Sequence, residues 1–159
     1  MRRQTEPEML RLIASYCSKA ERCIQDVRKK ISTTSISSEV EERIIARLLK
    51  ERYIDESRYC RSFVKDKFRF NRWGRIKIGY ELRGKNISAN DINEAISQID
   101  EDEYNSVLYD LLKDKMRTTM GKTAQDNFNK LYRFALSRGF ESNLTLQQLK
   151  KLYNTNFEF

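Results

Sequence analysis

Basic residues gather in the middle of the chain, where their number and spacing could bind acidic partners. Residues 57–85 hold ten Lys or Arg and only two acids, so this stretch carries the whole net charge of +8. Such a density exceeds what solubility requires, and we predict a surface for acidic protein, for nucleic acid, or for both. The predicted partner-binding residues are Arg58, Arg61, Lys65, Lys67, Arg69, Arg72, Arg75, Lys77, Arg83 and Lys85.

Aromatic residues alternate with these cations at residues 67–75, in the order KFRFNRWGR. Cations that follow a phosphate backbone, beside rings that stack on bases, are typical of single-strand nucleic-acid sites. On this interpretation Phe70 and Trp73 are the stacking residues. On the other interpretation Phe68 and Trp73 pack at a corner between two helices, where a small bundle needs large apolar side chains. The pattern favours packing for the rings and leaves both interpretations open.

The sequence offers no set of residues that could carry out catalysis. It contains no His, so a thiol such as Cys60 lacks its usual base, and a small apolar thiol inside a helix is the ordinary case. The four acids at residues 100–103 suit the positive end of a helix and point in different directions, unlike metal ligands. Neither a P-loop nor a GxGxxG motif is present. We therefore expect no catalytic residue, no metal site, no cofactor and no enzymatic activity.

The cysteines and the hydropathy pattern predict a cytoplasmic protein. Three cysteines, none of them in a CxxC pair, leave an odd thiol, which is typical of a reducing compartment. No apolar stretch approaches the roughly 20 residues that span a bilayer, and the N-terminus shows no convincing cleavage site. We expect a chain that is neither exported nor inserted into a membrane.

Helix signals recur at short intervals along the chain. With 34% charged residues, five Gly and one Pro, the composition favours helices over strands. Thr5, followed by acids and a Pro, predicts a helix that runs to about Ser18. Ser38 and Glu41 have the spacing of a capping box, and Gly139 is typical of a left-handed residue that ends a helix. Further N-caps are predicted at Asp55, Ser88, Asp100 and Thr123.

A short motif occurs twice, as YIDESRY at residues 53–59 and as QIDEDEY at residues 98–104. In both copies the Ile would end one group of helices, the Asp would cap the next helix and the Tyr would enter its apolar face. The copies differ in charge, because Arg58 in the first corresponds to Glu103 in the second. We interpret them as joints in a repeat protein. The sequence predicts an all-α tandem array of three three-helix units, at residues 1–54, 55–99 and 100–159.

The middle and last units carry patterns of a known family. The YIDESRY motif, the stretch GRIKIGYEL at residues 74–82 and KNIS at residues 85–88 resemble the RecX family of recombination regulators. The last unit agrees, with LYRF at residues 131–134 and SRGF at residues 137–140. The family usually has Gly where this chain has Asn86, a residue that also tolerates the left-handed conformation.

The resemblance implies an elongated, curved modulator of RecA. Members of this family bind RecA, lie in the groove of its filament on single-stranded DNA, contact more than one protomer, and restrain its ATPase, strand-exchange and coprotease activities. These properties imply a role in DNA recombination, DNA repair and the SOS response. We expect a monomer whose basic residues contact RecA, the RecA-DNA filament, or DNA itself.

One alternative from the residues themselves is a DNA-binding module, in which three-helix units act like helix-turn-helix elements and grip DNA directly. Inhibition of RecA-dependent ATP hydrolysis would separate the two functions. Reversing Arg72, Arg75 and Lys77 to Glu is expected to abolish inhibition. Helix content and melting temperature should hardly change, because exposed charges contribute little to stability.

Overall fold

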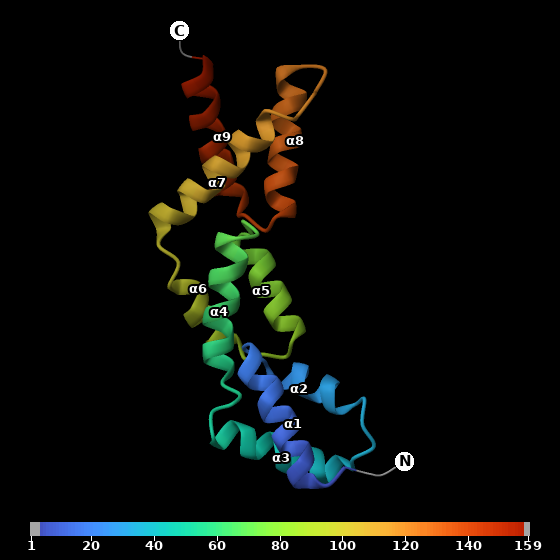
Figure 1. Ribbon diagram of the computed structural model, residues 1–159. Coiled ribbons are helices and arrows are strands. Elements are labelled where there is room, and N and C mark those ends of the chain that lie inside the picture. The colour runs from blue at the N-terminus through green and yellow to red at the C-terminus, as the bar shows by residue number, and fades with distance from the viewer. Residues whose placement is uncertain (1–3, 158–159) are drawn as a thin grey trace.

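The computed structural model describes residues 4–157, which form nine helices and no strand. The helices follow one another along an elongated molecule, with the two ends of the chain at opposite ends of its long axis (Figure 1). The predicted all-α repeat fold is confirmed. The helices are α1 (Glu6–Lys19), α2 (Ile24–Ile31), α3 (Ser38–Lys50), α4 (Glu56–Arg69), α5 (Arg75–Gly84), α6 (Ala89–Ser97), α7 (Glu101–Met116), α8 (Ala124–Ser137) and α9 (Ser142–Phe157).

The helices pack in three groups of three. Helices α1, α2 and α3 contact one another, α4 and α6 both pack against α5 and against each other, and α7 packs on α8 and α9. We call these groups the first, middle and third units. Figure 1 shows them stacked from the N-terminal end to the C-terminal end, so the middle unit has a neighbour on each side.

Local signals set most helix starts. The side chain of Thr5 accepts a hydrogen bond from the Glu8 amide and the Glu8 carboxylate accepts one from the Thr5 amide, which is the predicted capping arrangement. At α3 the prediction was wrong by one residue. The N-cap is Ser37, which has an extended backbone and whose hydroxyl oxygen accepts a hydrogen bond from the Val40 amide. Ser38 is already part of the helix. The four other predicted caps accept first-turn amides at α4, α6, α7 and α8: Asp55, Ser88, Asp100 and Thr123.

Left-handed residues follow several helices. Gly139 has φ of 95° after α8, as predicted, and Asn86 has φ of 60° after α5. Arg52 and Arg72 also have positive φ, and no local pattern predicted these two. In each case the left-handed residue turns the chain sharply towards the next helix, so the units stay short and compact.

The apolar core is divided in two. One cluster belongs to the first unit and includes Met9, Ile13, Ile44 and Leu48, all of them at most 1% exposed. A second cluster runs without interruption through the middle and third units and reaches into the first unit only at Cys23. The middle and third units are therefore joined through shared apolar packing, while the first unit has a core of its own.

Candidate functional site

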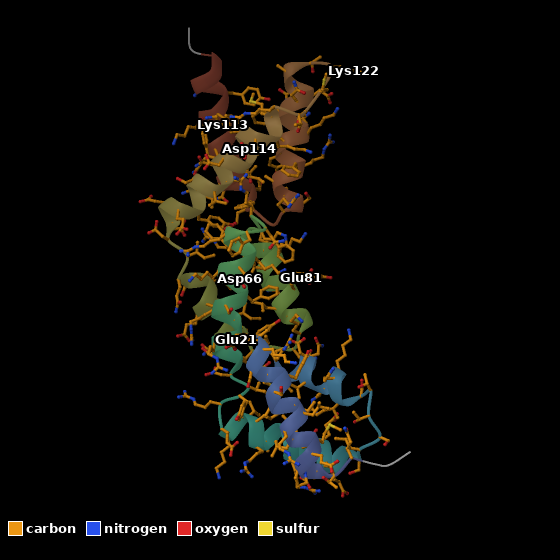
Figure 2. All side chains as sticks on the ribbon, in the orientation of Figure 1. Glu21, Asp66, Glu81, Lys113, Asp114 and Lys122 are labelled. Atoms are coloured by element: carbon orange, nitrogen blue, oxygen red, sulfur yellow. The ribbon has the colours of Figure 1, made fainter. Side chains whose placement is uncertain are left out.

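The middle unit meets the first unit at a largely polar contact, which we call the first joint. Arg58 on α4 pairs with Glu21, with 2.6 Å between Nε and Oε1, and Figure 2 shows Glu21 where the first unit approaches α4. Lys85, just beyond α5, pairs with Asp26 on α2 at 3.2 Å. Burial opposes ionisation of Asp26, but the Cys23 amide and the Lys85 ammonium hold the pKa of this carboxyl below its usual value. Two basic residues of the middle unit thus form ion pairs that connect it to the first unit.

At the contact with the third unit, the second joint, Arg75 occupies the centre. Its guanidinium pairs with Glu101 through two short contacts of 2.9 and 3.0 Å and approaches Glu141 at 3.4 Å. The guanidinium carbon lies 3.9 Å from the centre of the Tyr104 ring. The Tyr104 hydroxyl accepts a hydrogen bond from the Arg75 amide and donates one to Glu141. Burial raises the pKa of Tyr104, and the bond to Glu141 adds to this effect. Arg75 is therefore part of the structural contact.

The backbone completes the second joint. The Gly74 amide donates to the carbonyl of Arg138 at 2.7 Å, and the Ile76 amide donates to the carbonyl of Gly139 at 3.0 Å. The first turn of α5 has no side-chain cap, so these carbonyls and the Tyr104 hydroxyl satisfy amides that would otherwise lack partners. The end of α8 in this way caps the start of α5.

Two further cations of the middle unit also reach the third unit. Arg69 lies 3.5 Å from Glu103, and Arg72 lies 2.7 Å from Asp114; Figure 2 places Asp114 on α7. Five of the ten predicted binding residues thus form ion pairs with a neighbouring unit: Arg58, Arg69, Arg72, Arg75 and Lys85.

Both copies of the repeated motif lie at these joints. Glu56 accepts a hydrogen bond from the Ile24 amide at the start of α2, and Glu101, its counterpart, pairs with the side chain at the start of α5. The residue that differs in sign, Arg58 or Glu103, meets an opposite charge in each joint. The interpretation of the motifs as joints is therefore confirmed, and the change of sign follows the partner that each joint supplies.

The ten cations do not form one continuous surface. On α4, residues two apart such as Lys65 and Lys67 project about 200° apart around the helix axis. Arg75 is only 26% exposed at its side chain, so we now expect its reversal to destabilise the fold, unlike the reversal of an exposed charge. The sequence could show how many cations there are, but it could not show which of them are already paired.

One face of α4 leaves two cations unpaired beside a groove. Arg58, Arg61, Lys65 and Arg69 follow one another at helical spacing, and the first and last of them are held by the joints. In the described part of the chain, Arg61 bonds only to Ser57 and Lys65 forms no ion pair. They line a groove of about 270 Å³ between α4, α6 and the start of α7. Its other lining residues are Val64, Phe68, Arg69, Ala95, Gln98, Ile99 and Glu103.

The remaining cations lie elsewhere on the middle unit. The ammonium groups of Lys67 and Lys77 lie over the Trp73 ring, and Arg83 is exposed on α5. Trp73 also packs edge-on against Phe63, as the packing interpretation requires.

The other two rings of this stretch differ in their surroundings. Phe68 is buried and stacks on Tyr104 at 5.7 Å between ring centres, which confirms the packing interpretation for this ring. Phe70 is 83% exposed and stands clear of the core. Of the two rings predicted to stack on bases, Phe70 is thus the one that is open to solvent.

Among the described residues, the cysteines and the acidic side chains are not placed as a reactive thiol or a metal site would require. All three cysteines are buried thiols, and burial raises the pKa of Cys60 to about 11, so this thiol stays protonated at neutral pH. No group of three or more acidic or Cys side chains between residues 4 and 157 is placed to hold a metal ion. Over the same residues, none of the helices has the length and apolar character that a bilayer crossing requires.

A first prediction concerns the first joint. The double substitution Arg58→Ala and Lys85→Ala removes both ion pairs, each of which should contribute about 1 kcal/mol or less because the side chains are partly solvated. We expect amides of α1–α3 to exchange with deuterium several-fold faster, while α7–α9 keep their rates. Arg47→Ala is the control, since its partner Glu51 lies within the first unit. Equal acceleration in all three units would contradict a separable first unit.

Comparisons with known proteins agree with one another. Residues 55–96, which include most of the middle unit, match the family model "RecX, second three-helix domain". A "Regulatory protein RecX" from Clostridium botulinum strain Alaska E43 is 34% identical over 139 residues, which are 85% of this chain and 63% of the relative. Another, from Clostridium beijerinckii, is 29% identical, and this chain covers 60% of its length. The chain thus spans about three fifths of the length of these curated relatives.

Solved structures show the same fold. A crystal structure of RecX from Lactobacillus salivarius superposes with a TM-score of 0.82 at 18% identity, covering 92% of this chain and 96% of that one. Another crystal structure of a regulatory protein RecX gives 0.84 at 22% identity and covers 92% and 71%. The family model, the curated relatives and the shared fold agree: the chain is similar over most of its length to regulatory proteins named RecX, and its middle unit matches that family's second three-helix domain.

Proposed function

We propose that this chain is a cytoplasmic regulator that docks on RecA filaments formed on single-stranded DNA and restrains RecA's ATPase, strand-exchange and coprotease activities. Similarity to RecX proteins is the observation that carries the proposal, because relatives that match over most of this chain are named regulatory proteins.

We assign the docking surface to the groove beside α4. Arg61 and Lys65 are exposed there and have no carboxylate partner among the described residues, so an acidic partner would not need to break ion pairs seen in that part of the chain. Arg58 and Arg69, at the two ends of the same helix face, are held in place by their own pairs and keep that face positively charged. Complementary charge of this kind mainly raises the rate of association and selects the partner.

The test is RecA-dependent ATP hydrolysis on single-stranded DNA, measured with and without this protein at matched salt. We expect hydrolysis to fall as the protein is added. If hydrolysis is unaffected while the protein binds naked duplex DNA tightly, the helix-turn-helix type of module is the better description. For that alternative, affinity should also fall steeply with salt, on the order of a thousandfold between 50 and 200 mM for about six phosphate contacts.

A second prediction tests the groove. The double variant Arg61→Glu and Lys65→Glu should raise the concentration needed for half-inhibition by roughly tenfold or more, because like charges would then face an acidic partner. The free energy of unfolding should change by about 0.5 kcal/mol or less, since both side chains are exposed and neither forms an ion pair with a described residue. The matched control is Lys113→Glu with Lys122→Glu, which changes the same charge on the third unit (Figure 2). Unchanged inhibition by the groove variant would contradict this assignment.

A further inference from the structure

Two lysines converge on one ring at the corner between α4 and α5. The Nζ atoms of Lys67 and Lys77 lie 5.0 and 4.5 Å from the centre of the Trp73 ring. Both side chains are half-buried, and each leaves its own helix to reach the same ring. Cation–π contact accounts for their attraction to the ring, but it does not neutralise either charge.

No carboxylate balances this pair in the described part of the chain. Asp66 neighbours Lys67 on α4, and Glu81 lies one turn beyond Lys77 on α5, yet neither forms an ion pair with these lysines. Figure 2 labels both acids on their helices. Because the two ammonium groups lie 5.0 and 4.5 Å from the same ring centre, they are at most 9.5 Å apart (5.0 + 4.5). Two like charges at such a separation without a counter-charge repel each other, and an anion near both would relieve that repulsion.

The turn between the two helices adds a third cation and an open ring. Arg138, supplied by the third unit, donates to the Asn71 carbonyl at 3.5 Å and forms no ion pair among the residues described. Phe70, in the same turn, is 83% exposed although it is large and apolar. The corner thus combines three unneutralised cations with an aromatic face that nothing in the described structure covers.

We propose that this corner, formed by Lys67, Phe70, Trp73, Lys77 and Arg138, binds single-stranded nucleic acid. The two lysines would take a backbone phosphate, and Phe70 would stack on a neighbouring base. Unstacked bases are what an exposed ring can recognise, and base stacking beside a cationic track is the usual way to hold a single strand. An acidic protein segment would bind the cations but would not stack on the exposed Phe70 ring.

This site is separate from the groove that we assign to the protein partner. Lys67 projects from the far side of α4 relative to Lys65, so both sites can be occupied at once. The protein could therefore hold a strand of DNA at one surface while it contacts a protein at the other. The proposal goes beyond the proposed function, because docking on RecA requires no nucleic-acid contact by this chain.

Trp73 makes the test direct, because it is the only tryptophan in the sequence. A short oligothymidylate, titrated in the absence of RecA, should change the intrinsic fluorescence of the protein. Lys67→Ala with Lys77→Ala should weaken binding by roughly tenfold or more and reduce the slope of log affinity against log salt by about 0.7, the value for one lost phosphate contact on a single strand. Phe70→Ala should weaken binding by roughly fivefold or more without changing that slope.

The control is Lys113→Ala with Lys122→Ala, which removes the same charge from the third unit (Figure 2). We expect its affinity to match that of the unaltered protein, and circular dichroism should show the same helix content in every variant. An equal loss in the control would show attraction by net charge alone and overturn the site. Tighter binding of oligoglutamate than of oligothymidylate would identify the corner as a site for acidic protein instead, and no response to oligothymidylate would exclude a nucleic-acid site.

Discussion

Replacing Gly139 by Ala is expected to destabilise the protein by about 3 kcal/mol or more, because two penalties act at one position. Gly139 has φ of 95°, where a side chain strains the backbone. A Cβ there would also lie 2.4 Å from Lys77 Cβ and 2.5 Å from its amide nitrogen, so the second joint would have to open. The melting temperature should fall by roughly 6–12 °C for a chain of this size.

Gly74→Ala tests the same contact from the opposite side. A Cβ at residue 74 would meet the carbonyl oxygen of Gly139 at 2.3 Å, and a backbone atom cannot move aside as the tip of a flexible side chain can. The matched control is Gly84→Ala, since Gly84 lies at the end of α5 with nothing within 4 Å of an added Cβ. We expect the control to be neutral or more stable by up to about 1 kcal/mol, because Ala favours helix.

Chemical denaturation, with thermal unfolding beside it, measures all three glycine variants. If Gly74→Ala and Gly139→Ala unfold like the control, the backbone contact between α5 and α8 does not hold the units together. If either variant is too unstable to purify, deuterium exchange of the unaltered protein supplies the check: the Gly74 and Ile76 amides should be among the better protected ones, since both donate across the joint.

Reversing Arg75 to Glu should destabilise the fold by about 2–4 kcal/mol, and we expect any loss of regulation to follow from that destabilisation. The new carboxylate would face Glu101 and Glu141 in a partly buried contact, and Tyr104 would lose the cation above its ring. The variant should show a lower denaturation midpoint, whereas Arg61→Glu with Lys65→Glu should keep the midpoint of the unaltered protein.

A second substitution can distinguish the loss of the opposite charge at Arg75 from the change in side-chain shape. Combining Arg75→Glu with Glu101→Arg restores an opposite pair, and we expect it to recover part of the lost stability, with a coupling energy of about 0.5–3 kcal/mol. Full stability of Arg75→Glu alone would show that Arg75 is an exposed charge, and the original expectation from the sequence would then hold.

The helices and their joints could be predicted because their signals are local. An N-cap such as Asp55 or Asp100 meets an amide three residues away, so the spacing in the sequence already contains the contact. The repeated motif could be interpreted correctly for the same reason. Ser37 took the place of Ser38 because two adjacent hydroxyls satisfy the same rule, and only the backbone conformation distinguishes them.

The candidate site was predicted only in part. The sequence located the basic stretch and its aromatic rings, and it correctly favoured packing for Phe68. It treated the ten cations alike, because every Lys or Arg contributes the same charge to a count. Arg58 and Glu21 are 37 residues apart, and Arg72 and Asp114 are 42 apart, so no periodicity within a helix connects them.

The sequence by itself determined the helical class, the repeat, most caps and the charge of the middle unit, since these depend on contacts within one or two turns. Only the tertiary structure decided which cations pair across the joints, and which remain available at the α4 groove and at the Trp73 corner. The physical reason is that ion pairing requires oppositely charged groups within a few ångströms, and that distance is set by how the units stack.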